Sequence, residues 1–398
     1  MQFTLRGARL VDATMDQADG TIALDGAYIR AVGQSDAREQ EVIAAHDAII
    51  MPGFIEVHTH GGGGFNLHTS NVEEIVSYAH WIPTTGVTSF LIAVVGTPYT
   101  LPELQLRTAV AAIEQHGYKA AAEPLGIHLE GPYISEKRRG AHPPEWLRLP
   151  DDGETKRILE LTKDSLRLVT LAPELPGAEQ MIRQLTDSKV TVSIGHTDAD
   201  YEQTQTAIRL GITHATHCFN AMRPLLHREP GPLAAIAQAS QVFGEIIADG
   251  VHVHPAVIQM LVRMLGPERV IVITDAQAIA GTHEGGTFEF AGQEAQVVQG
   301  AACLADGTLA GSVLTMDQAL RNMLTMAHVS LQEAVRMLTL NPAQSARIAT
   351  SKGKLQAGYD ADILIFDQSL TLQATLCRGQ VAFATEAWQK RLGKVLLQ

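Results

Sequence analysis

The chain carries two different patterns of hydrophobic and polar residues. Near both ends, short runs interleave apolar and polar positions with Gly or Asp at the turns, as in TIALDGAYIRAVG at 21–33 and GKLQAGYDADILIFD at 353–367. This pattern predicts β-strands. In the middle, short apolar runs alternate with segments of helical periodicity, such as GAEQMIRQLTDS at 177–188. That alternation predicts strand–helix units and a parallel sheet.

Eight apolar runs in the middle predict the eight strands of a closed barrel. In chain order they are GFIEVHTH, VTSFLIAVV, LGIHLEGP, LRLVTLAPE, VTVSIGHTD, THATHCFNA, FGEIIADGVH and RVIVITDA. We therefore expect an α/β fold with a TIM-like (β/α)8 barrel over 51–352 and a small β-sandwich domain formed from both chain ends, 1–50 and 353–398. The stretch 136–156 lacks clean periodicity, which predicts a long loop or lid over the barrel mouth.

Composition narrows the classes of partner. The length of 398 residues suits a barrel with an added module. The net charge of −13 argues against nucleic acid or an anionic membrane as partner, although a local cluster of Arg and His can still bind a small anion. The first residues do not form a secretory leader, and no apolar stretch is long enough to span a bilayer. Three cysteines without paired spacing (Cys218, Cys303, Cys377) predict a reducing, cytoplasmic location.

Residues that can bind a metal or move a proton lie at the ends of several apolar runs. They are His58, His60, Glu130, His196, His217, His252 and Asp275. In a barrel all strand C-termini open onto one face, so these side chains are expected to converge. His58 and His60 are two residues apart and would point the same way. Burying so many ionisable groups without a cation is unfavourable, so the set predicts a divalent metal site.

Four glycines, Gly61–Gly64, follow the two histidines. We expect them to keep side chains away from the metal and the substrate and to adopt backbone angles that other residues resist. A bound metal lowers the pKa of water and polarises a carbonyl. Asp275, directly after the apolar run VIVIT, is placed to accept a proton and return it to a leaving group. Together these features predict hydrolysis at a carbonyl, especially that of an amide.

The segment HCFNAMRPLLHREPG at 217–231 adds candidate anion contacts. Arg223 and Arg228 lie in a predicted loop at the barrel mouth, and guanidinium groups fit phosphate well. Either arginine could instead pair with Glu229 or point into solvent.

Several segments also resemble a known family. They include PGFIEVHTHGGGG, GIHLEGPYI, GAHPPEWLR, IGHTDA, THCFNAMRPLLHREPG, ITDA, GTLAGSVLTM, NPAQSARI and GKLQAGYDADILIFD. In this order they resemble the amidohydrolase superfamily and, within it, the N-acetylglucosamine-6-phosphate deacetylase family. HLEGP together with THxxNAM is specific to this deacetylase group, whereas the first and last segments are shared more widely across the superfamily.

The resemblance implies a role for each matching residue. Glu130, His196 and His217 correspond to the common metal ligands, and Asp275 to the catalytic acid/base. The matched substrate contacts are Ala141, His142, Asn220, Ala221, Arg228, His252, Leu309, Ala310, Gly311 and Ser312. His142 would lie close to the acetyl carbonyl. The resemblance favours Arg228 over Arg223 as a phosphate contact.

Because His58 and His60 are present, the chain resembles family members that hold two metals bridged by Glu130, with Asp275 also on the first metal. The implied cofactor is one or two divalent metal ions per subunit, zinc or iron. The implied assembly is a homodimer in which a phosphate contact can cross the interface.

The implied reaction is deacetylation of N-acetylglucosamine 6-phosphate to glucosamine 6-phosphate and acetate, in amino-sugar catabolism or cell-wall recycling. The nearer alternative is the same chemistry on N-acetylgalactosamine 6-phosphate or another acetamido sugar. The more distant one is a non-enzymatic scaffold, which the complete ligand set disfavours.

Overall fold

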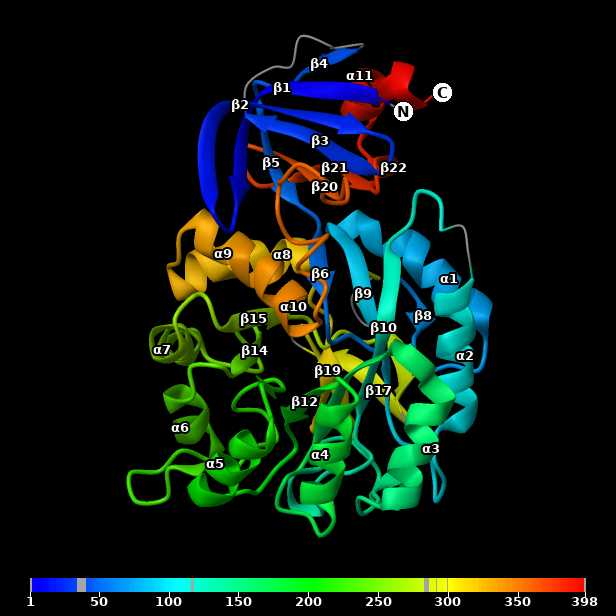
Figure 1. Cartoon of the computed structure of the whole chain (residues 1–398), viewed down its shortest axis with the longest axis vertical. Helices are drawn as coiled ribbons and strands as arrows, with labels where there is room; N and C mark the ends of the chain where they lie inside the picture. Colours follow the sequence, from blue (N-terminus) through cyan, green and yellow to red (C-terminus); the bar gives the residue numbers. More distant parts are fainter. Residues whose placement is uncertain are drawn as a thin grey trace.

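A computed structural model describes residues 2–33, 41–115, 118–282, 286–290, 292–298 and 300–396 of the chain. It confirms the predicted α/β fold. A parallel barrel with surrounding helices forms the larger part, and strands from both chain ends lie together at one end of the molecule (Figure 1). Across the described residues, every helix is too short or too polar to cross a membrane.

The eight predicted runs form the eight parallel strands of the barrel. In chain order they are β6 (Phe54–Glu56), β9 (Val87–Val94), β10 (Glu123–Glu130), β11 (Leu166–Leu171), β12 (Thr191–Ile194), β13 (His214–Ala215), β14 (Phe243–Ile247) and β15 (Val270–Ile273). Each strand pairs with the next along the chain. Nearly all their residues are buried, as expected for a parallel sheet covered by helices.

A buried carboxylate helps to close the barrel between its first and last strands. Glu56 accepts hydrogen bonds from the Thr274 hydroxyl at 2.7 Å and the Thr274 backbone N–H at 3.1 Å. Its other oxygen accepts the His58 N–H at 3.0 Å. Burial raises the pKa of Glu56 to about 8, although these hydrogen bonds oppose the shift. The Asp275 N–H also donates to the His58 carbonyl, so both residues are held at the same seam.

The helices of the barrel region lie on its outer side. They are α1 (Val72–Trp81), α2 (Glu103–Glu114), α3 (Asp152–Thr162), α4 (Ala178–Asp187), α5 (Tyr201–Leu210), α6 (Gly231–Gln238), α7 (Pro255–Leu265), α8 (Met316–Asn322), α9 (Leu331–Leu338) and α10 (Leu340–Ser345). Short turns add the 3-10 helices η1 (Ile82–Thr85), η2 (Glu136–Arg138), η3 (Pro144–Trp146) and η4 (Lys163–Ser165) and the π-helix η5 (Met323–Ala327).

The stretch 136–156, predicted as a loop or lid, is not irregular throughout. It holds η2 and η3, and α3 begins inside it because the Asp151 side chain accepts the Glu154 N–H and caps that helix. Its first part lines the cavity at the barrel mouth.

The chain ends form one eight-stranded sheet in the order β22-β21-β20-β5-β1-β2-β3, with β4 added on β1. These strands are β1 (Gln2–Asp12), β2 (Met15–Asp25), β3 (Tyr28–Gly33), β4 (Val42–Ala44), β5 (Ala48–Pro52), β20 (Ile363–Asp367), β21 (Leu372–Cys377) and β22 (Gln380–Ala384). The sheet and α11 (Glu386–Leu396) enclose a second hydrophobic core that includes Leu5, Ile50, Ile365 and Trp388. The division of the chain at 50 and 353 stays a prediction.

Two further sheets were not predicted. The first is the short hairpin β7 (Gly61–Gly62) and β8 (Phe65–Asn66). The second is an antiparallel sheet of β16 (Thr287–Phe290), β17 (Gln293–Val298), β18 (Ala301–Leu304) and β19 (Leu309–Ser312), inserted between β15 and α8. The last strand, β19, reaches the barrel mouth and supplies cavity residues.

Candidate metal centre and active site

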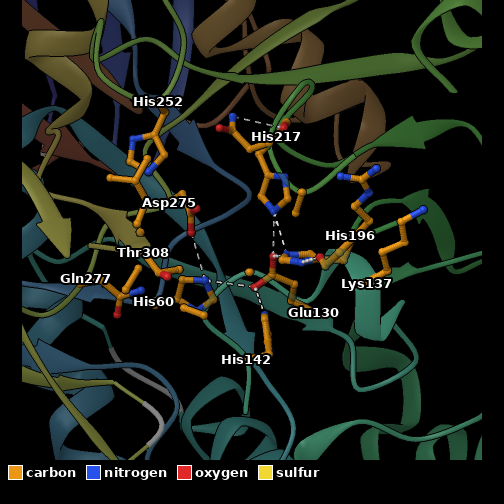
Figure 2. Close-up of a pocket in the computed structure, with 18 residues that line it drawn as sticks. His60, Glu130, Lys137, His142, His196, His217, His252, Asp275, Gln277 and Thr308 are labelled. Carbon is orange, nitrogen blue, oxygen red and sulfur yellow. Dashed lines mark hydrogen bonds and ion pairs between the residues drawn. The ribbon is translucent and has the colours of Figure 1, made fainter. Parts of the chain in front are cut away.

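A cavity of about 350 Å³ opens at the C-terminal ends of the barrel strands. Figure 2 shows His60, His196 and His217 pointing toward Glu130, with Asp275 and His142 on either side of His60. His60, Glu130, His196, His217 and Asp275 come from separate strand ends, as predicted for a barrel, whereas His142 lies in the loop between η2 and η3.

Glu130 is the point on which the histidines converge. Its Oε1 atom lies 3.3 Å from His58 Nε2, 3.2 Å from His196 Nε2 and 3.2 Å from His217 Nε2. Its Oε2 atom lies 3.2 Å from His60 Nε2. All five side chains are buried. The Nε2 atoms of His196 and His217 lie only 3.0 Å apart, which suits two ligands of one ion.

Asp275 completes a second group with the first pair of histidines. Its Oδ1 atom lies 3.1 Å from His60 Nε2 and 3.6 Å from His58 Nε2. Ligand atoms of His58, His60 and Asp275 all lie within 4.8 Å of one another, and so do those of Glu130, His142 and His196. The Nε2 atom of His58 is buried without a hydrogen-bond partner among the described residues. Nitrogen and carboxylate donors in two adjacent groups fit one or two divalent ions.

The strand ends share a local geometry that aims these side chains inward. His58, His196, His217 and Asp275 each lie two residues beyond the last residue of their strand. Three of them have positive φ: 46° at His196, 28° at His217 and 51° at Asp275. Such backbone is strained for residues other than glycine, although Asp and His tolerate it better than most, and it gathers at functional sites.

The charges favour a cation at this point. Burial lowers the pKa of His60, but Asp275 and Glu130 outweigh it and raise that pKa to about 9. Burial opposes ionisation of Asp275, but His58 and His60 hold the pKa of its carboxyl below the usual value. The two carboxylates of Glu130 and Asp275 therefore call for positive charge between them. A divalent metal supplies that charge and leaves the histidine rings neutral.

Contacts outside the ligand set fix two of the rings. The Nδ1–H of His196 donates to the Arg138 carbonyl at 2.9 Å, which turns Nε2 toward Glu130. The Nδ1 atom of His58 lies 2.9 Å from Glu245 Oε2.

His142 is buried with its Nε2 atom 3.8 Å from Glu130 Oε2. Burial, assisted by His196, lowers the pKa of His142 to about 3, so its ring is neutral.

Most predicted substrate contacts lie around the same cavity. Its wall includes Ala141, His142, Asn220, Ala221, His252, Leu309, Ala310 and Gly311. Two predicted contacts do not line it. Ser312 is buried behind the wall, where its N–H donates to the Asp275 carbonyl at 2.8 Å. Arg228 is exposed outside the cavity. Arg223 pairs with Glu229 at 2.9 Å, one of the two alternatives left open by the sequence.

The expectation that the four glycines keep side chains away from the substrate needs correction, whereas the expected backbone angles are confirmed: φ is 156° at Gly61, 62° at Gly63 and 92° at Gly64. They are absent from the cavity wall, so they do not make room for a substrate there. A Cβ atom at Gly62 or Gly63 would lie 2.3 or 2.4 Å from the Trp81 ring, and one at Gly61 would lie 2.2 Å from the Phe65 carbonyl. Gly61, Gly62 and Gly63 are therefore required by close packing against α1 and within the β7–β8 hairpin, whereas Gly64 has open space around it and is favoured by its φ alone.

Several residues of the site were missed from the sequence. Glu245 and Glu56 are acidic residues within apolar runs, a signal that could have drawn attention to them. Lys137 and Arg138 line the cavity and both pair with Asp198, at 2.6 and 2.8 Å. They lie in the basic run EKRRG of the predicted lid. Gln277 and Thr308 also line the cavity but carry no distinguishing sequence signal.

A parallel barrel with four histidines and two carboxylates at its strand ends defines the class of metal-dependent barrel hydrolases. The model of the Amidohydrolase family matches residues 49–389, so the chain belongs to this family.

Similar proteins are deacetylases of phosphorylated amino sugars. The chain is 35% identical to N-acetylglucosamine-6-phosphate deacetylase of Lysinibacillus sphaericus, over 94% of this chain and 95% of that protein. It is 34% identical to N-acetylgalactosamine-6-phosphate deacetylase of Escherichia coli O157:H7, over 96% and 100% of the two chains.

A solved structure is also similar along nearly its whole length. It is a mutant N-acetyl-D-glucosamine-6-phosphate deacetylase from Mycobacterium smegmatis in complex with N-acetyl-D-glucosamine-6-phosphate, with a TM-score of 0.90 and 34% identity. The alignment covers 96% of this chain and 100% of that one.

Proposed function

We propose that the chain hydrolyses the acetamide of N-acetylglucosamine 6-phosphate to glucosamine 6-phosphate and acetate, a step of amino-sugar metabolism. The observation that carries the proposal is the convergence of four histidine Nε2 atoms on Glu130, with Asp275 next to two of them, at a cavity whose wall also holds polar groups suited to a sugar phosphate. The similarity to deacetylases acting on this substrate supports it.

The residues that would hold metal form two positions. His58, His60 and Asp275 make the first. Glu130, His196 and His217 make the second, because both rings lie 3.2 Å from Glu130 Oε1, and Glu130 also faces His58 and His60. A divalent ion bound there, zinc or iron, polarises the acetyl carbonyl and lowers the pKa of water.

The side chains of this chain carry the proton transfers. Asp275, ionised and facing the cavity, accepts a proton from the attacking water. It then delivers that proton to the amide nitrogen, which leaves as the amine of the sugar. The neutral His142 ring donates a hydrogen bond to the oxygen on which negative charge develops. Among the described residues, Glu130 is the other acid in the cavity wall, and its two oxygens already face four histidine Nε2 atoms, which leaves Asp275 for the proton transfers.

The phosphate is assigned to the part of the wall formed by Asn220, Ala221 and His252. The His252 Nδ1–H donates to Asp249 Oδ2 at 2.6 Å, which turns Nε2 away from Asp249. Although burial lowers the pKa of His252, its bond to Asp249 outweighs this and raises it above the usual value. A ring that stays protonated to higher pH is a favourable partner for a phosphate dianion.

We expect KM for the phosphorylated sugar to rise as pH increases through the raised pKa of His252, because the ring then loses its charge. Asp249→Asn should move that rise to lower pH, and kcat should change much less. The measurement is a KM profile over pH with phosphorylated and unphosphorylated sugars. His254→Asn is the matched control, since His254 caps α7 and is outside the cavity wall. A pH profile unchanged in Asp249→Asn would contradict the assignment.

Within its own subunit Arg228 is exposed and does not line the cavity. We therefore propose a homodimer in which Arg228 completes the partner's site. Arg228→Ala should raise KM for the phosphorylated sugar by about 10- to 100-fold, the value of one charge-assisted hydrogen bond, and leave the unphosphorylated sugar unaffected.

Mixing two defective variants tests directly whether Arg228 of one subunit serves the active site of the other. Arg228→Ala and Asp275→Asn subunits, unfolded and refolded together, should recover activity, because a mixed dimer holds one site with both intact groups. Arg223→Ala serves as control, since Arg223 pairs with Glu229 outside the cavity. An unchanged KM in Arg228→Ala would contradict this role.

The experiment that tests the proposed reaction is acetate release by the purified chain from three sugars in parallel: N-acetylglucosamine 6-phosphate, its galacto epimer and unphosphorylated N-acetylglucosamine. We expect fastest release from the gluco phosphosugar. The similarity to an N-acetylgalactosamine-6-phosphate deacetylase makes the galacto epimer the second candidate, and preference for it would replace the substrate while keeping the chemistry. No release from any of them would contradict the proposal.

We also propose a cytoplasmic location, which the three free cysteines support.

A further inference from the structure

One buried carboxylate next to the metal centre has no part in the mechanism above. Glu245 lies in the middle of β14, and its side chain is fully buried. A buried charge of this kind is unfavourable unless donors surround it. Three donors do: the His58 ring, the His214 ring and the His217 backbone N–H, at 2.9, 2.8 and 3.0 Å.

The two oxygens of this carboxylate face different sides. Oε2 accepts both from the ring of His58 and from the backbone of His217, and these two residues belong to the two metal positions. Oε1 faces His214, whose other ring nitrogen lies 2.6 Å from the Ser345 hydroxyl of α10. The contacts with His58 and His217 therefore share Oε2, whereas the contact of Oε1 with His214 leads outward to Ser345 of α10.

The bond to His58 decides which ring nitrogen can bind metal. An ionised carboxylate only accepts hydrogen bonds, so the Nδ1 atom of His58 must carry the hydrogen. The Nε2 lone pair then faces Glu130 and Asp275, at 3.3 and 3.6 Å. A carboxylate behind a ligating histidine fixes the ring orientation and makes the nitrogen a better donor to metal.

The bond to His217 holds a strained turn. His217 has a φ of 28°, a value that L-residues rarely adopt. Its N–H donates to Glu245 Oε2, and the next N–H, of Cys218, donates to the Glu245 carbonyl at 2.9 Å. Both bonds support the backbone conformation that carries the His217 ring to Glu130.

We propose that Glu245 is a positioning residue for the metal centre, in which one carboxylate oxygen orients His58 at the first metal position and the His217 turn at the second. The inference rests on the metal centre of the proposed function. It predicts that Glu245 controls metal affinity at both positions, although it contacts neither the substrate nor the metal.

The test is Zn²⁺ affinity of the full-length chain after metal removal, compared among wild type, Glu245→Gln, Glu245→Leu and Ser345→Ala. Glu245→Gln keeps an oxygen that can accept from His58 and His217 but lacks the charge, so its affinity should fall about 10-fold. Glu245→Leu lacks both the accepting oxygen and the charge, so its Zn²⁺ affinity should fall about 100-fold. Ser345→Ala removes only the contact on the far side of His214 and should bind as wild type does.

A second readout separates positioning from general destabilisation. Co²⁺ loaded into wild type and Glu245→Gln should give different visible spectra, because ligand orientation changes, whereas Ser345→Ala should match wild type. If Glu245→Leu does not fold, Glu245→Gln and the spectrum still decide the matter. If Glu245→Gln binds Zn²⁺ as tightly as wild type does, or if Ser345→Ala loses as much Zn²⁺ affinity as Glu245→Gln, the role of Glu245 is overturned while the metal centre stands. A wild-type chain that binds no Zn²⁺ would overturn the metal centre and this inference together.

Discussion

Replacing Asp275 with Asn is expected to lower kcat for acetamide hydrolysis by about 10³- to 10⁴-fold while metal stays bound at the second position, formed by Glu130, His196 and His217. The amide has the shape of the carboxylate but cannot accept the proton of the attacking water. Its position should persist, because the Asp275 backbone N–H and carbonyl bond to the His58 carbonyl and the Ser312 N–H at 3.0 and 2.8 Å. The measurement is kcat together with metal per chain in the same sample.

Asp200→Asn is the matched control for this substitution. Asp200 caps α5 through a capping box with Gln203 and is outside the cavity wall, and Asn is an equally good cap. It should leave kcat unchanged. Near-normal turnover in Asp275→Asn, with metal retained, would remove Asp275 from the proton transfers and require another acid in the site.

Replacing Glu130 with Gln is expected to remove metal from both positions and to lower kcat by roughly 10³-fold or more. Four histidine Nε2 atoms lie within 3.3 Å of the two Glu130 oxygens. A glutamine side chain lacks the negative charge that both metal positions share, and its NH₂ group would face at least one of these rings. Polarisation by a metal is worth several kcal/mol, and each ~1.4 kcal/mol is a factor of ten in rate.

His58→Gln provides the comparison, because His58 belongs only to the first metal position. Elemental analysis should find the largest metal loss in Glu130→Gln and partial loss in His58→Gln. Equal metal content in wild type and Glu130→Gln would show that the carboxylate does not bridge the two positions.

The barrel could be predicted because its signals are local. Each apolar run, its following helix and the polar residue at its end lie within a few tens of positions, and barrel topology brings the strand ends together. His58, His60, Glu130, His196, His217 and Asp275 therefore converge as predicted.

The remaining features depend on contacts between distant segments. Glu245 meets the His58 ring across a separation of 187 residues, and no periodicity in one sequence pairs them. The reason for Gly62 and Gly63 is the Trp81 ring of α1, which cannot be seen in the run of glycines itself. The sheet of 287–312 was missed because an alternation of strand and helix was expected throughout the middle of the chain.

Arg228 marks a limit of a different kind. The loop sequence predicted an anion contact, yet within one subunit the side chain lies outside the cavity. The proposed completion of the site by a second copy therefore rests on the exposed position of Arg228 and on the family resemblance, not on a pattern along one chain.

We propose that one metal-dependent site at the barrel mouth performs the hydrolysis. The decisive measurement is acetate release from N-acetylglucosamine 6-phosphate by the metal-stripped chain while Zn²⁺ is added back in measured equivalents. We expect no release without metal and full release once one or two ions per chain are bound. Full activity in the stripped chain, or no release from a fully loaded one, would contradict it.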